Sequence, residues 1–212
     1  MKKILLLGDS IRKGYDKYVA MAFEGVAEVY YPKDNCRFAA YLLRNLGDWK
    51  KELGCGSDVD LIHWNAGLWD TLELQDGLPL TDLSVYQSYL PRIHGIMQML
   101  WPDAKQIFAT STAVIEHLFL GACKRKNAVI EQYNRVAVET LTPLGVQIND
   151  LYELNRTFPE SYHSDCTHMY TRCGTEPIVK QVISYIEQAL DIRAKELDYD
   201  ALFATEKDTV GI

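Results

Sequence analysis

The tripeptide Gly8-Asp9-Ser10 is the first stretch whose residue types could carry out chemistry. It follows directly after the short apolar run 3–7. If that run is a parallel strand, the tripeptide lies at its carboxyl end, where open α/β sheets bind their ligands. A serine there offers its hydroxyl as a nucleophile, and the backbone N–H groups around it can stabilise a developing oxyanion. An ordinary capped helix start explains the same residues, because Asp and Ser are common N-caps.

A base for such a serine is offered near the other end of the chain by Asp165-Cys166-Thr167-His168. A hydroxyl is a weak nucleophile until a base takes its proton, and histidine titrates near neutral pH. The second ring nitrogen needs an acceptor, which Asp165 can supply from the same turn. An unrelated loop explains these residues too, as does metal ligation by His163, Asp165 and His168. No further histidine or acidic cluster in the sequence completes a metal site, so we expect no metal.

Asn65 follows the third apolar run, 61–64, and its amide could donate to the oxyanion that Ser10 creates. Turn chemistry alone also explains an asparagine after a strand. The three stretches are more specific together than apart. They follow the first, third and fifth predicted strands, and a parallel sheet brings the carboxyl ends of its strands to one edge.

Short apolar runs alternate with longer segments of helical periodicity, which predicts an α/β fold with a parallel sheet. Five strands are expected at 3–7, 26–31, 61–64, 106–110 and 145–148. Helices are expected at 13–25, 38–53, 82–100, 126–144 and 174–197. Residues 1–197 are interpreted as a single domain. The charged tail 198–212 is expected either to fray or to dock on a neighbouring subunit, which would make the protein a homo-oligomer.

The composition argues against a disordered, collagen-like or coiled-coil protein. Of 212 residues, 48% are hydrophobic and 24% charged, as in soluble globular domains. The net charge of −7 repels phosphate backbones, and the basic run Lys124-Arg125-Lys126 is too short to overcome this, so we expect no nucleic-acid partner. The expected partner is a small molecule.

Cysteine usage and the N-terminus bear on the compartment. The five cysteines form no C-x-x-C pair and match no zinc spacing, which favours reduced thiols. The N-terminal apolar stretch of four residues is shorter than the roughly seven that a secretion signal needs. No segment approaches the roughly 18 apolar residues of a membrane span. We therefore expect a cytoplasmic protein with no membrane partner.

The order of these motifs resembles the SGNH (GDSL-type) hydrolases, from residue 3 to about 190. The resemblance implies a three-layer α/β/α sandwich around a parallel five-stranded sheet, flavodoxin-like, with no cofactor. It implies that Ser10 is the nucleophile, His168 the general base and acid, and Asp165 the carboxylate that orients it.

Two positions depart from the family pattern. Arg37 stands where the second block of the family has a glycine whose N–H joins the oxyanion hole. Trp69 stands where the third block, Gly-x-Asn-Asp, has its asparagine, and the nearest asparagine is Asn65. The expected oxyanion donors are therefore the backbone N–H groups of Ser10 and Arg37 and the amide of Asn65.

The resemblance implies hydrolysis of a carboxylic ester through an acyl-enzyme, and we expect a short acyl group such as acetate on a carbohydrate. Substrate contacts are expected from Arg12, Trp69 and Tyr162, although strand-end aromatics are usually core and arginines usually solvated. Two alternatives stay open. One is a lysophospholipase or thioesterase on the same triad, and the other is a non-catalytic ligand-binding module that kept the fold.

Overall fold

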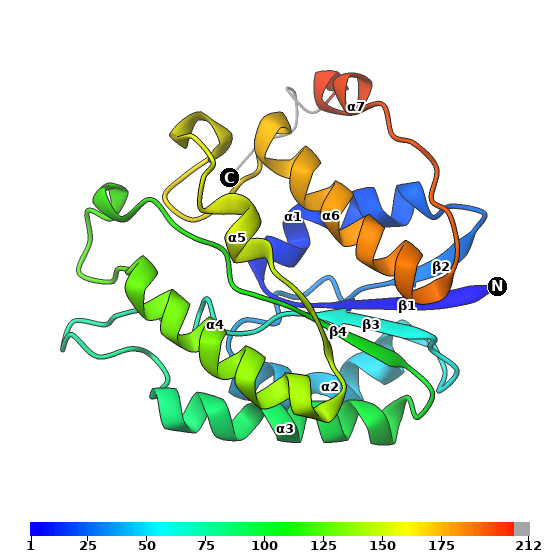
Figure 1. Cartoon of the computed structure of the whole chain (residues 1–212), viewed down its shortest axis with the longest axis horizontal. Helices are drawn as coiled ribbons and strands as arrows, with labels where there is room; N and C mark the ends of the chain where they lie inside the picture. Colours follow the sequence, from blue (N-terminus) through cyan, green and yellow to red (C-terminus); the bar gives the residue numbers. More distant parts are fainter. Residues whose placement is uncertain (206–212) are drawn as a thin grey trace.

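The computed structural model describes residues 1–205, and within them five parallel strands form one sheet (Figure 1). The strand order is β2-β1-β3-β4-β5, so the order reverses between β1 and β3. In doubly wound sheets this reversal opens a crevice at the carboxyl ends of the strands. The strands are β1 (Lys2–Leu7), β2 (Ala27–Tyr30), β3 (Leu61–Trp64), β4 (Lys105–Ala109) and β5 (Gln147–Asn149).

Strands β1 and β3 are buried on both faces, which is why they are apolar almost without interruption. All four residues of β3 and the last four of β1 are buried. The parallel register pairs Leu7 with Trp64, and the Asn65 N–H donates to the Leu7 carbonyl at 3.0 Å. This register places the residues that follow β1 beside those that follow β3.

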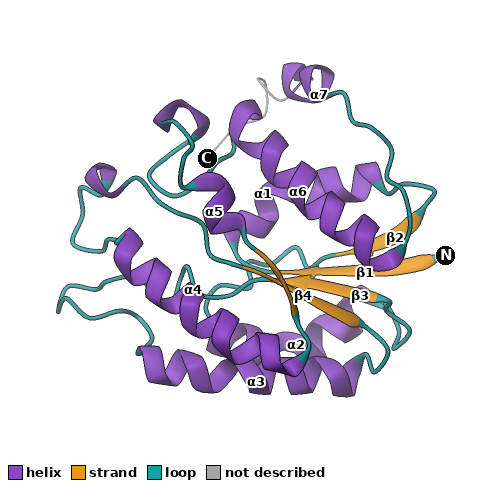
Figure 2. Ribbon diagram, viewed as in Figure 1, coloured by secondary structure: helices purple, strands orange, loops and turns teal. Residues whose placement is uncertain are grey.

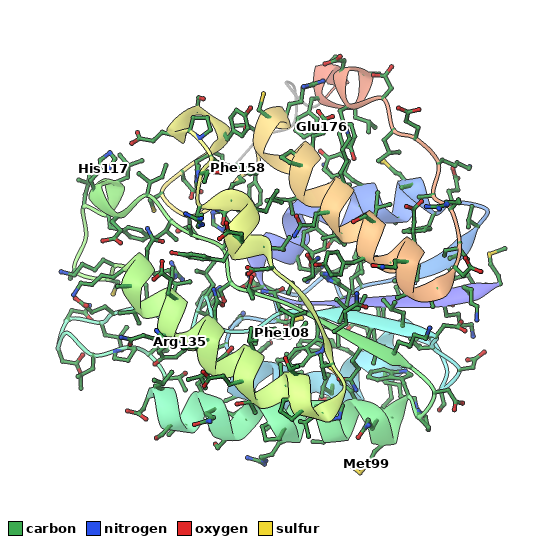
Figure 3. The ribbon with its side chains drawn as sticks, in the orientation of Figure 1. Met99, Phe108, His117, Arg135, Phe158 and Glu176 are labelled. Atoms are coloured by element: carbon green, nitrogen blue, oxygen red, sulfur yellow. The ribbon has the colours of Figure 1, made fainter. Side chains whose placement is uncertain are left out.

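Helices cover both faces of the sheet, as Figure 2 shows. One face carries α2 (Ala39–Leu53), α3 (Leu83–Leu100) and α4 (Asn127–Leu141). The other carries α1 (Ser10–Ala22), α5 (Leu151–Asn155), α6 (Arg172–Leu190) and α7 (Tyr199–Thr205). Apolar side chains fill the space between the layers; Phe108 of β4, for example, packs edge-to-face on Trp64 at 4.8 Å between ring centres (Figure 3). The expected three-layer α/β/α sandwich is confirmed.

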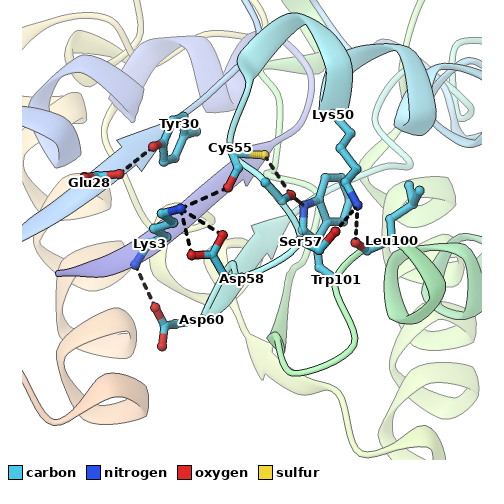
Figure 4. Close-up of polar contacts among 11 residues, drawn as sticks. Lys3, Glu28, Tyr30, Lys50, Cys55, Ser57, Asp58, Asp60, Leu100 and Trp101 are labelled. Atoms are coloured by element: carbon cyan, nitrogen blue, oxygen red, sulfur yellow. Dashed lines mark hydrogen bonds and ion pairs between the residues drawn. The ribbon is translucent and has the colours of Figure 1, made fainter.

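At the amino-terminal ends of the strands, polar contacts join neighbouring segments (Figure 4). Lys3 Nζ lies 2.8 Å from Asp58 Oδ1, and Lys50 Nζ lies 2.6 Å from Ser57 Oγ. The Trp101 indole N–H donates to the Gly56 carbonyl at 3.0 Å. These contacts join the segments around the starts of β1, β3 and β4, at the end of the sheet opposite to the carboxyl-terminal ends of the strands.

The helix boundaries differ from the sequence prediction at several ends. Helix α1 begins at Ser10 rather than 13, and α6 covers Arg172–Leu190 rather than 174–197. Helices α5 and α7 were not predicted. None of the helices within residues 1–205 is both long and apolar enough to cross a membrane.

The first part of the predicted tail packs on its own chain. The ring of Phe203 stacks on Tyr18 at 5.5 Å, and Asp200 pairs with Arg172 at 2.6 Å. Tyr199 is 6% exposed. The tail prediction also covers residues 206–212, which lie outside the described residues.

Candidate active site

The turn after β1 both starts a helix and presents a hydroxyl. Asp9 is the N-cap of α1, and its Oδ1 accepts the Ile11 N–H at 2.9 Å. Because Asp9 does the capping, Ser10 at the first helical position is free to direct its half-buried side chain elsewhere. The capped helix start is therefore confirmed, and it is compatible with a nucleophilic role for Ser10.

Ser10, His168 and Asp165 form a continuous chain of hydrogen bonds. His168 Nε2 lies 2.7 Å from Ser10 Oγ, and His168 Nδ1 lies 2.7 Å from Asp165 Oδ2. The three residues come from the start of α1 and from the loop before α6. This is the arrangement in which an imidazole removes a proton from a hydroxyl while a carboxylate fixes its tautomer.

Asp165 is held as a carboxylate by its own turn. Burial opposes its ionisation, but hydrogen bonds from the His168 ring and from the N–H groups of Thr167 and His168 outweigh burial and lower the pKa of Asp165. The two backbone bonds measure 2.7 and 2.8 Å to Oδ1. One oxygen therefore fixes the turn, and the other remains for the imidazole.

Tyr170 contacts both the base and the nucleophile turn, and the sequence analysis missed it. Its ring stacks on His168 at 4.7 Å with 25° between planes, and its hydroxyl donates to the Ser10 carbonyl at 2.6 Å. Gly14 makes room for the ring, since a Cβ at Gly14 would lie 2.6 Å from it. The only signal in the sequence is an aromatic residue two positions after the predicted base.

Asn65 lies against the nucleophile turn, as the register of β1 and β3 requires. It is 4% exposed, and a Cβ on Gly8 would lie 1.8 Å from its Oδ1, so only glycine fits there. Burial raises the pKa of Asp9, while the adjacent Asn65 amide and the Ile11 N–H act in the opposite direction. The Asn65 amide therefore lies against Gly8 and Asp9 of the nucleophile turn, and its role as an oxyanion donor stays a prediction.

Arg37 does not have a free backbone N–H. The N–H donates to Asn35 Oδ1 at 2.8 Å, an Asx turn within the loop, and so is not available as the predicted oxyanion donor. Arg37 adopts a left-handed conformation, φ 51°, which a glycine would adopt without strain. Its exposed side chain lies over the Tyr41 ring at 4.8 Å.

The prediction that Arg12 binds substrate is wrong. The Arg12 side chain is completely buried, where it pairs with Asp16 and donates to the carbonyls of Gly8, Pro32 and Asp34. A guanidinium with its donors satisfied in this way has none left for a ligand. Arg12 instead fastens the nucleophile turn to the loop after β2.

Among the described residues, no hydrogen bond or ring contact joins Trp69 or Tyr162 to the side chains of the Ser10–His168–Asp165 chain. Trp69 is half-buried in the turn after β3. Tyr162 packs on Phe158, the residue labelled in Figure 3, at 5.3 Å between ring centres. Its carbonyl accepts the Thr171 hydroxyl at 2.7 Å, which braces the two ends of the triad loop. A substrate role for either residue stays a prediction.

Asp70 joins the β3 loop to the start of α2. Its Oδ2 accepts the Ala39 N–H at 3.0 Å, and Phe38, at the N-cap position of α2, offers no side-chain cap. Asp70 therefore caps α2 from a distant loop. Burial raises the pKa of Asp70 to about 6.

Arg125 is a second residue of the candidate site that the sequence analysis passed over. It precedes α4, and its Nε donates to the Leu68 carbonyl at 2.6 Å. Arg125 is thereby fixed to the loop that carries Asn65. The basic run containing it was weighed only as a nucleic-acid patch, for which it is too short.

Within residues 1–205, no group of three or more His, Cys, Asp or Glu side chains is placed to hold a metal ion. Asp165 and His168 are instead bonded to each other. The alternative of metal ligation by His163, Asp165 and His168 therefore finds no such group among the described residues.

Comparison with known proteins supports the α/β/α fold expected from the sequence. No family model matches the chain, and no curated protein does. Among solved structures, a lipase/acylhydrolase from Enterococcus faecalis is 18% identical, with a TM-score of 0.69, covering 93% of this chain and 100% of that one. An acetyl xylan esterase is 15% identical, with a TM-score of 0.68 and coverages of 87% and 99%. A GDSL-like lipase from Bacteroides thetaiotaomicron is 15% identical, with a TM-score of 0.69 and coverages of 89% and 89%. The chain therefore has the fold of these proteins, in agreement with the resemblance found in the sequence.

Proposed function

We propose that this protein is a serine ester hydrolase of the SGNH type. The observation that carries the proposal is the hydrogen-bonded chain from Ser10 through His168 to Asp165, with 2.7 Å at each step. A buried asparagine beside the nucleophile turn and the fold shared with esterases and lipases support the same activity.

In the first half of the reaction, Ser10 Oγ attacks the acyl carbon while His168 Nε2 takes its proton. Asp165 accepts the Nδ1–H and stabilises the imidazolium that forms. The negative charge on the carbonyl oxygen faces the Ser10 N–H, at the amino end of α1, and the Asn65 amide. His168 then returns its proton to the departing alcohol oxygen, which leaves the acyl group on Ser10.

In the second half, water takes the place of the alcohol. His168 removes a proton from that water, and the resulting hydroxide attacks the acyl carbon. The bond to Ser10 Oγ breaks, Ser10 recovers its proton from His168, and the carboxylic acid departs. The same three side chains therefore serve both steps.

The test of activity is the hydrolysis of p-nitrophenyl acetate by the wild type and by Ser10→Ala. A rate for the wild type that disappears in Ser10→Ala is the expected result. Equal rates, or no rate in either protein, would favour the non-catalytic ligand-binding module.

For the substrate, we propose a short acyl group, such as acetate on a carbohydrate. The neighbour described as an acetyl xylan esterase supports this choice. The measurement is kcat/KM on p-nitrophenyl esters of increasing acyl length, together with acetylated sugars. We expect acetate to be the best acyl group, whereas a rise with chain length would favour a lysophospholipase or thioesterase.

A further inference from the structure

Arg125 lies where two loops of the candidate site meet. Its Nε donates to the carbonyl of Leu68, three residues after Asn65, at 2.6 Å. The loop that carries Asp165 is near as well, because the guanidinium interacts electrostatically with Asp165 and Asp9. Arg125 therefore lies between the loop of the oxyanion donor and the loop of the base.

Within residues 1–205, Arg125 forms no salt bridge, although Asp9 and Asp165 act on its charge electrostatically. Its neighbours Lys124 and Lys126 both pair with Glu73, at 3.3 and 2.7 Å, as alternate residues of an extended segment do. Arg125 extends from the same segment to Leu68 instead, where it meets a carbonyl oxygen rather than a carboxylate. Among the described residues, the Arg125 guanidinium is therefore not bonded directly to a carboxylate.

The two terminal nitrogens of Arg125 are also without a hydrogen-bond partner among the described residues, yet neither is sealed from solvent. Burial lowers the pKa of Arg125 by more than the nearby acids Asp9 and Asp165 raise it, so the cost of keeping this cation partly out of water is only partly offset. A bound anion would offset that cost.

We propose that Arg125 binds an anionic group of the ester substrate, a carboxylate or a phosphate, through its two terminal nitrogens. The proposal rests on the proposed ester hydrolase function and names its substrate class. A guanidinium whose Nε is already fixed presents its remaining N–H groups as a planar fork, which suits both oxyanions. Arg125 would thereby select anionic esters for a site that also contains the acids Asp9 and Asp165.

The test uses ester pairs that differ in one anionic group. The pairs are p-acetoxybenzoate and its methyl ester, p-acetoxyphenyl phosphate and phenyl acetate, and p-nitrophenyl hemisuccinate and p-nitrophenyl butyrate. For each pair, the ratio of kcat/KM for the anionic ester to that for the neutral ester is measured. The first two pairs separate carboxylate from phosphate, and the third places the anion on the acyl side.

We expect the wild type to prefer the anionic member of at least one pair, and Arg125→Ala to reduce that ratio about 10- to 100-fold, the value of a charged hydrogen bond. Arg125→Gln, which keeps an N–H for the Leu68 carbonyl, should show the same loss and serves if Arg125→Ala does not fold. The matched control Lys126→Ala should keep the ratio within about twofold, since surface charges contribute little.

Three results would overturn the proposal. They are a preference for the neutral ester in every pair, an unchanged ratio in Arg125→Ala and Arg125→Gln, and an equal loss in Lys126→Ala. An unchanged ratio with lower rates on both esters would mean that Arg125 only holds the Leu68 loop.

Binding to Ser10→Ala, measured by calorimetry with p-acetoxybenzoate and p-acetoxyphenyl phosphate, separates this inference from the proposed function. If the wild type hydrolyses no ester, and Ser10→Ala binds these anions while the double variant Ser10→Ala/Arg125→Ala does not, the hydrolase is contradicted and the anion site is supported. Ser10-dependent hydrolysis with unchanged ratios would contradict the anion site alone.

Discussion

His168 is held on three sides, by Ser10 and Asp165 at its two nitrogens and by Tyr170 at its face. With Nδ1–H donating to a carboxylate, Nε2 carries the lone pair that a general base needs. The lowered pKa of Asp165 keeps that carboxylate ionised in mildly acidic solution. Under the proposed function, these contacts would arrange the three side chains for proton transfer before substrate binds.

The first prediction is that Ser10 and His168 act as one unit. Ser10→Ala and His168→Ala should each lower kcat by up to ~10⁶, and the double variant should cost no more than either. Asp165→Asn should cost less, about 10⁴, because the base remains present. Steady-state kinetics on p-nitrophenyl acetate measure all four variants, and losses that multiply in the double variant would contradict a shared mechanism.

The second prediction concerns Asn65. Asn65→Ala should lower kcat about 10²- to 10³-fold and leave KM nearly unchanged, because an oxyanion donor binds the transition state more tightly than the ground state. The melting temperature of the same preparation is the control. If Asn65 only shapes its turn, the melting temperature should fall while kcat stays near that of the wild type.

The third prediction separates the two contacts of Tyr170. Tyr170→Phe keeps the ring on His168 and loses the hydrogen bond to the Ser10 carbonyl, so kcat should fall only about 3- to 10-fold. Tyr170→Ala loses both contacts and should fall further, with KM nearly unchanged and an altered pH profile of kcat. A profile identical to that of the wild type in Tyr170→Ala would assign Tyr170 to packing alone.

At the scale of the elements, helix α2 depends on a cap supplied by another segment. Asp70, from the loop after β3, accepts the first N–H of α2, and its carboxylate is buried. Since the α2 N-terminus lies beside the Arg37 loop, the Asp70 contact couples two loops of the site. Its raised pKa also makes the stability of the protein depend on pH.

The fourth prediction follows from that pKa. Asp70 titrates at about 6 in the folded protein, against an ordinary value of 3.8, so the folded state holds the proton more tightly. Its contribution is fully present below about pH 4 and is lost as pH rises through about 6, by roughly 3 kcal/mol. Urea unfolding of the wild type and Asp70→Asn at pH 4 and pH 8 should show the variant gaining relative stability at pH 8. The exposed Asp103 provides the control Asp103→Asn, and an equal shift in both variants would contradict the prediction.

The sequence was sufficient for elements whose stability is local or strongly apolar. The buried runs of β1 and β3 have no alternative in an α/β chain, and the order of motifs along parallel strands places Ser10, Asn65 and His168 at one edge. Helix α5, with five residues, is too short to show a periodicity. Helix α7 lies in a charged segment and depends on the distant contact between Phe203 and Tyr18.

Side-chain roles were harder to predict than elements. Arg12 was expected to contact substrate, although Asp16 stands four residues later and is a natural helix partner for it. Its other acceptors are backbone carbonyls on a separate loop, which no spacing encodes. The roles of Tyr170 and Arg125 likewise arise only from contacts between segments far apart in the chain.

At the scale of the whole molecule, the amino-terminal and carboxyl-terminal ends of the strands differ in the contacts that they carry. At the amino-terminal ends of the strands, contacts such as that of Lys3 with Asp58 join neighbouring segments (Figure 4). The carboxyl-terminal ends carry the candidate site. We expect substitutions at the amino-terminal ends to change stability and those at the carboxyl-terminal ends to change rate.

The fifth prediction concerns the C-terminal segment. Because α7 packs on α1 of the same chain, deletion of 198–212 should lower the melting temperature. The deletion should leave the assembly state unchanged, as measured from the molar mass in light scattering. Tyr199→Ala alone should cost about 2 kcal/mol through lost apolar burial, whereas Leu120→Ala, at a side chain 96% exposed, should cost almost nothing. A change of assembly state on deletion would support docking on a neighbouring subunit.

The nucleophile and its base are separated by 158 residues, while the base and its carboxylate share one turn. A ribosome adding about 5–20 residues per second makes Ser10 roughly 10–30 s before His168. Under the proposed function, a nascent chain therefore has no complete triad until residues 165–168 have been made and α6 docks on α1. Recovery of esterase activity would then report the final docking step of folding, and complementation between separately made N- and C-terminal fragments would report the same event.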